Sequence, residues 1–200
     1  MAKEQTGESV RKRLLTESAR LFAEQGFEGT SVQEVVVAAG VTKGAMYHYF
    51  SSKDDLLHEI YSRVLRLQME RLTAIADGPG SVQERLHAAA ADVVTTTAEN
   101  IDDSTTFFRS MHLLEPETHK LVRAERRRYH ERFRDLVTEG QRLGVFDDLV
   151  PADLVVDYFF GSVHHLGSWY HADGALSGAQ VGKHFADLLL TSLGAGQRGE

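Results

Sequence analysis

The chain has 200 residues, of which 42% are hydrophobic and 26% are charged, and its formal net charge is -7. These values are typical of a globular protein with one or two domains and a sizeable core. The sequence has no cysteine, which excludes disulfides and thiolate metal sites, and it has no run of 18 apolar residues, so no membrane-spanning helix is predicted.

Apolar residues recur at helical spacing from the start of the chain. Leu15, Ala19 and Phe22 fall at i, i+4 and i+7 and predict a first helix that ends near Gly26. The sequence before it, MAKEQTGESVRKR, contains no apolar segment of the kind found in secretory signals. A cytoplasmic protein is therefore expected.

Two short helices follow, joined by a tight turn. Ser31 with Glu34 fits a capping box and predicts a helix over residues 31–39, which Gly40 ends. Thr42 can cap the next helix, which is predicted over residues 42–49. This is the helix-turn-helix arrangement, and in its DNA-binding versions the second helix enters the major groove.

The later helices are longer. Ser52 can cap a fourth helix, and the sequence DGPG at residues 77–80 ends it. The polar sequence IDDS at residues 101–104 is interpreted as a break. Further helices are predicted over about residues 81–100, through 107–111, over about 116–144, from 151 through Trp169, and from Ser177 onward.

The pattern predicts about nine helices and no sheet, so the expected fold class is all-α. The first helices are short and closely connected, whereas those after about residue 50 are long. Helix length therefore places a domain boundary in this region. We expect a three-helix domain over residues 8–68 and a larger helical bundle over residues 69–200.

The third helix has two faces of different chemistry. The residues that can pack on the first two helices are Met46, Tyr49 and Phe50. The residues on the outward face are Lys43, Gly44, Tyr47 and His48. Lys43 supplies charge, and Gly44 lets the backbone approach bases closely. Tyr47 and His48 can donate hydrogen bonds to phosphate oxygens.

Three further residues are placed to contact phosphate. Ser31 and Thr42 stand at helix starts, where hydroxyls and backbone N–H groups can donate to an anion, and Lys53 lies in the first turn of the fourth helix. The alternative is a plain helical hairpin within a larger bundle. That alternative leaves the outward residues unexplained, because alanine or glutamate would favour the helix more.

The charge balance limits how many phosphates this region can contact. Residues 1–60 hold seven basic and nine acidic residues, so the region is not basic. Few charges can reach phosphate in one subunit, and a dimer doubles that number. A clear but moderate salt dependence of DNA binding is therefore expected.

The sequence LFAEQGFEGTSVQEVVVAAGVTKGAMYHYFSSKDDLL, residues 21–57, resembles the N-terminal signature of the TetR family of transcriptional regulators. The matching elements are LFAEQGF, TSV, AAGV, KGxxYxYF and SKDDL. The resemblance implies a three-helix DNA-binding unit on a larger ligand-binding and dimerisation bundle. It implies DNA-facing positions for Thr42, Lys43, Gly44, Tyr47 and His48, and phosphate contacts for Ser31 and Lys53.

Two residues of the second predicted helix depart from the family pattern. Val36 stands where the family usually has alanine, and Val37 replaces a usual polar residue. We expect these changes either to shift the packing of this helix slightly or to leave Val37 covered by a neighbour. Neither change lies in the helix predicted over residues 42–49, which we call the reading helix.

The resemblance also implies an effector pocket and a dimer interface after about residue 70. The last two predicted helices carry broad apolar stripes, and two such helices per subunit can form a four-helix bundle across a two-fold axis. The alternative is that both stripes belong to an internal core. The stripe residues are Tyr158, Phe159, Leu166, Trp169, Val181, Phe185, Leu188 and Leu189. Gly182 can allow close helix approach, whereas Gly174 and Gly178 are interpreted as turn residues.

The sequences LLEPETHKLV, EGQRLGVFD and WYHADGALS look like those of a TetR subgroup in which many members sense acyl-CoA thioesters. Such a ligand needs an apolar tunnel and basic residues for its phosphates. The candidate effector-binding residues are Phe108, Arg109, His112, Tyr158, His165 and Trp169. Further candidates for phosphate contacts are Arg123, Arg126 and Arg127, unless their Arg-rich stretch is simply a solvated helix face.

Other classes of protein find little support. The ten histidines include no HExxH or similar pair, so no metal site is predicted, and no cofactor is expected. There is no G-x-S-x-G, P-loop or dinucleotide fingerprint, so an enzyme is not expected.

The prediction is a homodimeric repressor that binds a pseudo-palindromic operator and is released by a small-molecule effector. The alternatives are a carrier bundle with a vestigial DNA module and an enzyme that uses the helical pocket.

Overall fold

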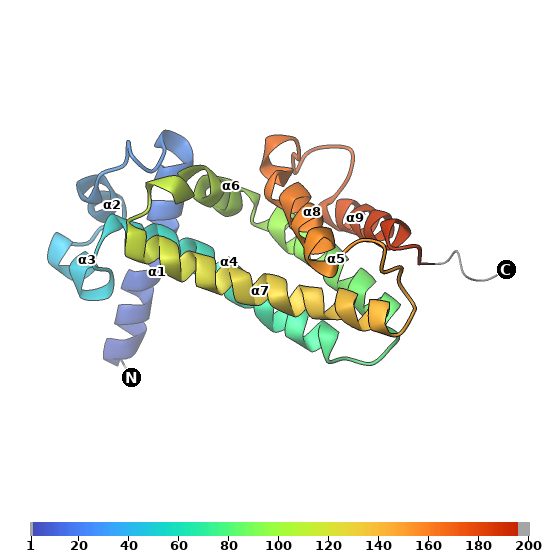
Figure 1. The fold of residues 1–200 in the computed structure, drawn as a ribbon. Coiled ribbons are helices and arrows are strands. Elements are labelled where there is room, and N and C mark those ends of the chain that lie inside the picture. The colour runs from blue at the N-terminus through green and yellow to red at the C-terminus, as the bar shows by residue number, and fades with distance from the viewer. Residues whose placement is uncertain (1, 196–200) are drawn as a thin grey trace. The chain divides into compact units, whose positions relative to one another are not determined.

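The computed structural model describes the backbone of residues 2–195 and the side chains of residues 9–195. Within this range the regular elements are all helices, which confirms the all-α prediction (Figure 1). The α-helices are α1 (Ala2–Gln25), α2 (Val32–Ala38), α3 (Lys43–Tyr49), α4 (Lys53–Ala76), α5 (Val82–Glu99), α6 (Ile101–Ser110), α7 (Pro116–Arg142), α8 (Ala152–His164) and α9 (Gly178–Ser192). The 3₁₀-helices are η1 (Met111–Leu113) and η2 (Leu166–Ser168). Over the described residues, none of the helices has the length and apolar character needed to cross a bilayer.

The chain forms two compact units. The first unit comprises Met1–Arg63 and Asp102–Arg123, and the second comprises Val64–Ile101 and Ala124–Glu200. These units differ from the domains expected from helix length, because the segment 102–123 packs with the N-terminal helices rather than with the larger bundle. The functional division at residue 68 stays a prediction.

The core of the first unit is built from the apolar faces of its first three helices. Its buried residues include Leu14, Phe22, Val35 and Met46. Phe22 meets Phe27 edge to face, with ring centroids 5.2 Å apart. Helix α3 contacts both α1 and α2, and Met46, which is fully buried, anchors its inner face. The outer face of α3 is thereby presented on a supported helix.

Capping interactions fix the ends of the short helices. The Ser31 hydroxyl accepts a hydrogen bond from the Glu34 N–H at 3.2 Å, and the Glu34 carboxylate accepts one from the Ser31 N–H at 2.7 Å. Thr42 accepts from the Ala45 N–H at 3.1 Å. Gly40 follows α2 with φ +62°, in the left-handed region that favours glycine. The predicted caps are confirmed, and they set where α3 begins.

Two predicted helix boundaries are wrong. Residues 101–104, interpreted as a break, belong to α6, and the interruption is confined to Asn100, the C-cap of α5. The two aspartates at this position suit a helix start, because carboxylates there interact favourably with the helix dipole. The helix predicted through Trp169 ends at His164 and is followed by η2.

In the second unit, α9 packs along α5 (Figure 1). A Cβ atom on Gly182 would lie 2.6 Å from both the Ala91 carbonyl oxygen and Thr95 Oγ1. A Cβ atom on Gly178 would lie 2.8 Å from the Cβ of Ala98. Close helix approach at Gly182 is therefore confirmed. Gly178 is more than a turn residue, because it begins α9 and packs against α5.

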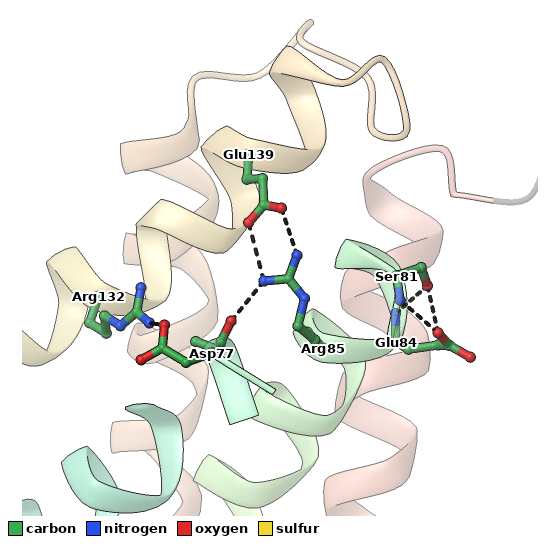
Figure 2. Close-up of polar contacts among 7 residues, drawn as sticks. Asp77, Ser81, Glu84, Arg85, Arg132 and Glu139 are labelled. Carbon is green, nitrogen blue, oxygen red and sulfur yellow. Dashed lines mark hydrogen bonds and ion pairs between the residues drawn. The ribbon is translucent and has the colours of Figure 1, made fainter. Parts of the chain in front are cut away.

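Figure 2 shows a polar network where α4 ends in the second unit. Arg85 donates to both oxygens of the Glu139 carboxylate, at 2.6 and 3.2 Å, and to the carbonyl oxygen of Ala76 at 2.7 Å. Arg132 donates to the Asp77 carboxylate. A bidentate guanidinium–carboxylate pair fixes direction as well as distance. The network therefore joins the end of α4 to α5 and α7.

Candidate functional site

The outer face of α3 forms the surface that the sequence assigns to DNA. Its exposed residues are Lys43, Gly44, Tyr47 and His48. Tyr47 exposes 54% of its surface, although tyrosine is usually more buried. On the opposite face, Met46 and Phe50 are buried and Tyr49 is half-buried. The burial pattern thus follows the predicted division of faces, while the DNA contacts themselves stay predictions.

Gly44 is not required by the fold of the chain. Its φ lies outside the left-handed region, and a Cβ atom placed on it would have only Thr42 Oγ1 within 4 Å, at 3.8 Å. Glycine within a helix costs up to ~1 kcal/mol relative to alanine. The bare backbone at this position therefore has no internal explanation, and it suits close approach of an external partner.

The two cap residues share a structural role and differ in the donor that they have left. The hydroxyls of Ser31 and Thr42 each accept a hydrogen bond from a backbone N–H of the helix that they cap, and both residues are exposed. A hydroxyl that accepts one bond still has its proton to donate. Thr42 can therefore cap its helix and donate to a phosphate at the same time. The Ser31 backbone N–H and the Ser31 hydroxyl both hydrogen-bond to the Glu34 carboxylate and lower the pKa of that group.

The ammonium group of Lys53 makes contacts within the first unit. Its ammonium group donates to the carbonyl oxygens of Phe27 at 2.6 Å and Thr30 at 2.9 Å, and it lies 4.3 Å from the centre of the Phe27 ring. Two of its three N–H donors are thus used to hold the segment that joins α1 to α2. One donor remains, and the phosphate contact of Lys53 stays a prediction.

The two departures from the family pattern have separate outcomes. Val36 is buried and joins the core of the first unit. Val37 exposes 68% of its surface, so the expectation that a neighbour covers it is wrong. An apolar residue is thus left at the surface of α2.

The six candidate effector residues are divided between the two units. Phe108, Arg109 and His112 belong to the first unit, and the other three belong to the second. Phe108 packs edge to face on Tyr61, with ring centroids 5.9 Å apart. Arg109 and His112 are exposed. Of the three candidates in this unit, Phe108 is the one for which the described residues show aromatic packing.

The other three candidates lie at the surface of the second unit. Tyr158 exposes 71% of its surface and His165 is also exposed. Trp169, half exposed, stacks on Phe185 with ring centroids 6.3 Å apart. A groove runs between α8 and α9, and its lining includes Tyr158, Phe159, Ser162, Phe185, Leu188 and Leu189. This position fits a dimer interface better than an interior effector pocket.

A polar cluster in the second unit joins one predicted phosphate candidate to two histidines that the sequence assigned to no site. It consists of Arg126 and His130 on α7 and His164 on α8. Arg126 Nη2 lies 3.2 Å from His164 Nδ1, and a guanidinium can only donate, so the imidazole is neutral. The His130 ring stacks on Phe160 at 3.9 Å and lies 5.8 Å from the His164 ring. The i, i+4 spacing of Arg126 and His130 is the one sequence signal that places them together.

Burial is the main electrostatic influence on these histidines. It lowers the pKa of His130 to about 4, assisted by the charge of Arg126 and opposed by Asp157. It lowers the pKa of His164 to about 3, assisted by Arg126 and His130. Both imidazoles are therefore neutral at pH 7.

Acidification is expected to destabilise the protein through this cluster. An unfolded histidine has a pKa of about 6.5, whereas folded His130 has a pKa of about 4. Between these two pH values the unfolded chain binds a proton at this residue and the folded protein does not. The contribution of neutral His130 to the free energy of unfolding is full above pH 6.5, and it falls by at most ~1.4 kcal/mol per pH unit below that pH. His130→Phe should therefore lose less unfolding free energy than the wild type as the pH falls. Urea denaturation at a series of pH values measures this.

The matched control for this prediction is His171→Gln, because His171 is exposed in the same unit. It should follow the wild-type pH dependence. An unchanged pH dependence in His130→Phe would contradict the role given to this imidazole.

Two family models match the chain. "Bacterial regulatory proteins, tetR family" matches residues 14–60, and "Tetracyclin repressor-like, C-terminal domain" matches residues 79–193. The chain is 30% identical over 202 residues to the HTH-type transcriptional repressor KstR2 of Rhodococcus jostii, covering 96% of this chain and 95% of that protein.

Solved structures of similar fold cover almost the whole chain. The TetR family regulator PfmR of Thermus thermophilus aligns with a TM-score of 0.81 and 29% identity, covering 90% of this chain and 97% of that one. AibR in complex with isovaleryl coenzyme A and operator DNA aligns with a TM-score of 0.75 and 23% identity, covering 90% and 97%. The second likeness concerns the fold alone.

Proposed function

The chain belongs to the TetR family of transcriptional regulators, and from this premise we propose that it is a dimeric repressor which a small hydrophobic effector releases from a pseudo-palindromic operator. The observation that carries the proposal is the outer face of α3. It offers an ammonium group, a phenol hydroxyl and bare glycine backbone on a helix whose inner face is anchored by Met46. Two such helices, one per subunit, would enter successive major grooves.

The exposed apolar face of α8 and α9 supports a dimer. Tyr158 on α8 and Leu188 on α9 expose 71% and 68% of their surfaces, and both line the groove between these helices. Apolar side chains gathered on one face indicate a partner surface. A second copy of the pair would complete a four-helix bundle across a two-fold axis.

The proposed effector class is an acyl-CoA thioester or a related hydrophobic anion. AibR, whose fold the chain shares, binds isovaleryl coenzyme A. In the second unit, Arg126 contacts His164, whose ring lies 6.0 Å from that of Phe160, and Phe160 meets Phe133 edge to face at 5.3 Å. A guanidinium beside aromatic rings suits a ligand that has both an anionic and an apolar part. The protein would act in the cytoplasm and would bind the thioester without cleaving it.

Footprinting of the DNA upstream of the protein's own gene tests the proposal. The expected result is a protected palindrome that isovaleryl-CoA or a longer acyl-CoA releases and free coenzyme A does not. A coupling of ~1–3 kcal/mol would weaken operator binding roughly 5- to 150-fold. Absence of protection even at low salt would favour the carrier alternative. Mass spectrometry of the thioester recovered after incubation tests the other alternative. Conversion of the thioester to a product would favour an enzyme that uses the helical pocket.

A further inference from the structure

Three of the six basic side chains described between residues 9 and 60 have partners within this region. Arg11 pairs with Glu59 at 2.6 Å, and Arg20 pairs with two glutamates of α1, at 2.9 and 2.7 Å. Lys53 is committed to the carbonyl oxygens of Phe27 and Thr30. The number of charges that can reach a phosphate is therefore smaller than the sequence count suggests.

The other three basic residues have no internal partner among the described side chains. Over the side chains described between residues 9 and 60, those that form no ion pair or internal hydrogen bond are Lys12, Arg13 and Lys43. Lys43 belongs to the outer face of α3. Lys12 and Arg13 stand on α1, outside the reading helix.

The guanidinium group of Arg13 lies beside the turn between α2 and α3. Its Nη1 atom is 4.0 Å from the position that a Cβ atom on Gly40 would occupy. Gly40 stands two residues before Thr42, the N-cap of α3. Arg13 is exposed, and the glutamate one helical turn after it, Glu17, is already paired with Arg20. Among the described side chains no carboxylate pairs with this guanidinium, which stands near the end of α3 proposed to enter a major groove.

We propose that Arg13 binds a backbone phosphate of the operator. A guanidinium presents two parallel N–H donors that match the oxygens of a phosphate. A phosphate contact fixes the register of the protein on the duplex without reading its sequence. The inference rests on the proposed operator binding and adds an element to it, because α1 then becomes part of the DNA interface.

Arg13→Gln tests this contact through the salt dependence of binding. Affinity for an operator duplex and for an unrelated duplex is measured by fluorescence anisotropy across a range of KCl concentrations. Each phosphate contact contributes about 0.9 to the steepness of the plot of log binding constant against log salt concentration. The substitution removes one contact from each subunit, so the slope of the dimer should become shallower by about 1.8. At ~0.1 M salt this amounts to a loss of roughly ten- to a hundredfold. Both duplexes should be weakened by a similar factor.

Two variants make the result specific. Arg20→Gln makes the same change of charge on the same helix, but Arg20 is held by Glu17 and Glu24, so the wild-type slope should persist. Arg13→Lys keeps the charge and should keep the slope. The inference is overturned if Arg13→Gln retains the wild-type slope, or if it weakens only the operator, which would indicate a base contact. Failure of the wild-type protein to bind either duplex would overturn the proposed function instead.

Discussion

Alanine at Lys43 or at Tyr47 is expected to lower operator affinity about 100-fold in each single variant. A hydrogen bond to a charged group contributes ~1.5 kcal/mol, and a symmetric dimer loses it twice, which gives ~3 kcal/mol. Each 1.4 kcal/mol is about tenfold in affinity. Both side chains are exposed, so the fold should be unaffected. Anisotropy with the footprinted operator measures the affinity, and circular dichroism and sedimentation check fold and dimer.

The control for this pair is Lys120→Ala on α7, because Lys120 is exposed and pairs only with neighbouring Glu117 at 3.0 Å. That variant should bind the operator like the wild type. If both Lys43→Ala and Tyr47→Ala also retain full affinity, the outer face of α3 is not the reading surface. A result of that kind would leave the family assignment intact and would move the interface to another part of the first unit.

The reading helix could be predicted from the sequence because its determinants are local. The caps at Ser31 and Thr42 and the stop at Gly40 act over three or four residues, and the two faces of α3 follow from the helical period alone. The same local logic failed at residues 101–104. Polar residues there favour a loop and the first turn of a helix alike, and only the surrounding fold decides between them.

The roles of Lys53 and Arg13 could not be predicted, because their neighbours are distant in sequence. Lys53 donates to carbonyl oxygens 23 and 26 residues away, and Arg13 lies beside Gly40. Nothing in the local pattern distinguishes a lysine that contacts phosphate from one that holds the segment between α1 and α2. The effector candidates met the same difficulty. Aromatic and histidine content placed Tyr158 and His165 in a pocket, whereas folding placed them at the surface.

Valine at Gly182 is expected to lower the free energy of unfolding by ~3 kcal/mol. Its Cβ atom would lie 2.6 Å from the Ala91 carbonyl oxygen and from Thr95 Oγ1, and these two atoms are hydrogen-bonded to each other at 2.7 Å. Neither atom can move aside without breaking that bond, so α9 must shift away from α5. Overpacking of this kind costs about 1–3 kcal/mol, and the second clash puts valine at the upper end. Urea denaturation measures the loss.

The same substitution at Gly161 provides the matched control, because a Cβ atom there would meet no described atom within 4 Å beyond its chain neighbours and the backbone of its own helix. Gly161→Val should keep or slightly raise stability, since valine favours a helix more than glycine does. If Gly182→Val is as stable as the wild type, α5 and α9 are not in the close contact described above.

The displacement of α9 should also weaken operator binding by weakening the dimer. Phe185 and Leu188 on this helix line the groove proposed as the dimer surface. Gly182→Val should dissociate at protein concentrations where the wild type is dimeric, which sedimentation measures. Its affinity for a full palindromic operator should fall, while its affinity for a single half-site should stay unchanged, because α3 is untouched. Equal losses on both duplexes would mean instead that the substitution disturbs the first unit, and the assignment of dimerisation to α8 and α9 would fail.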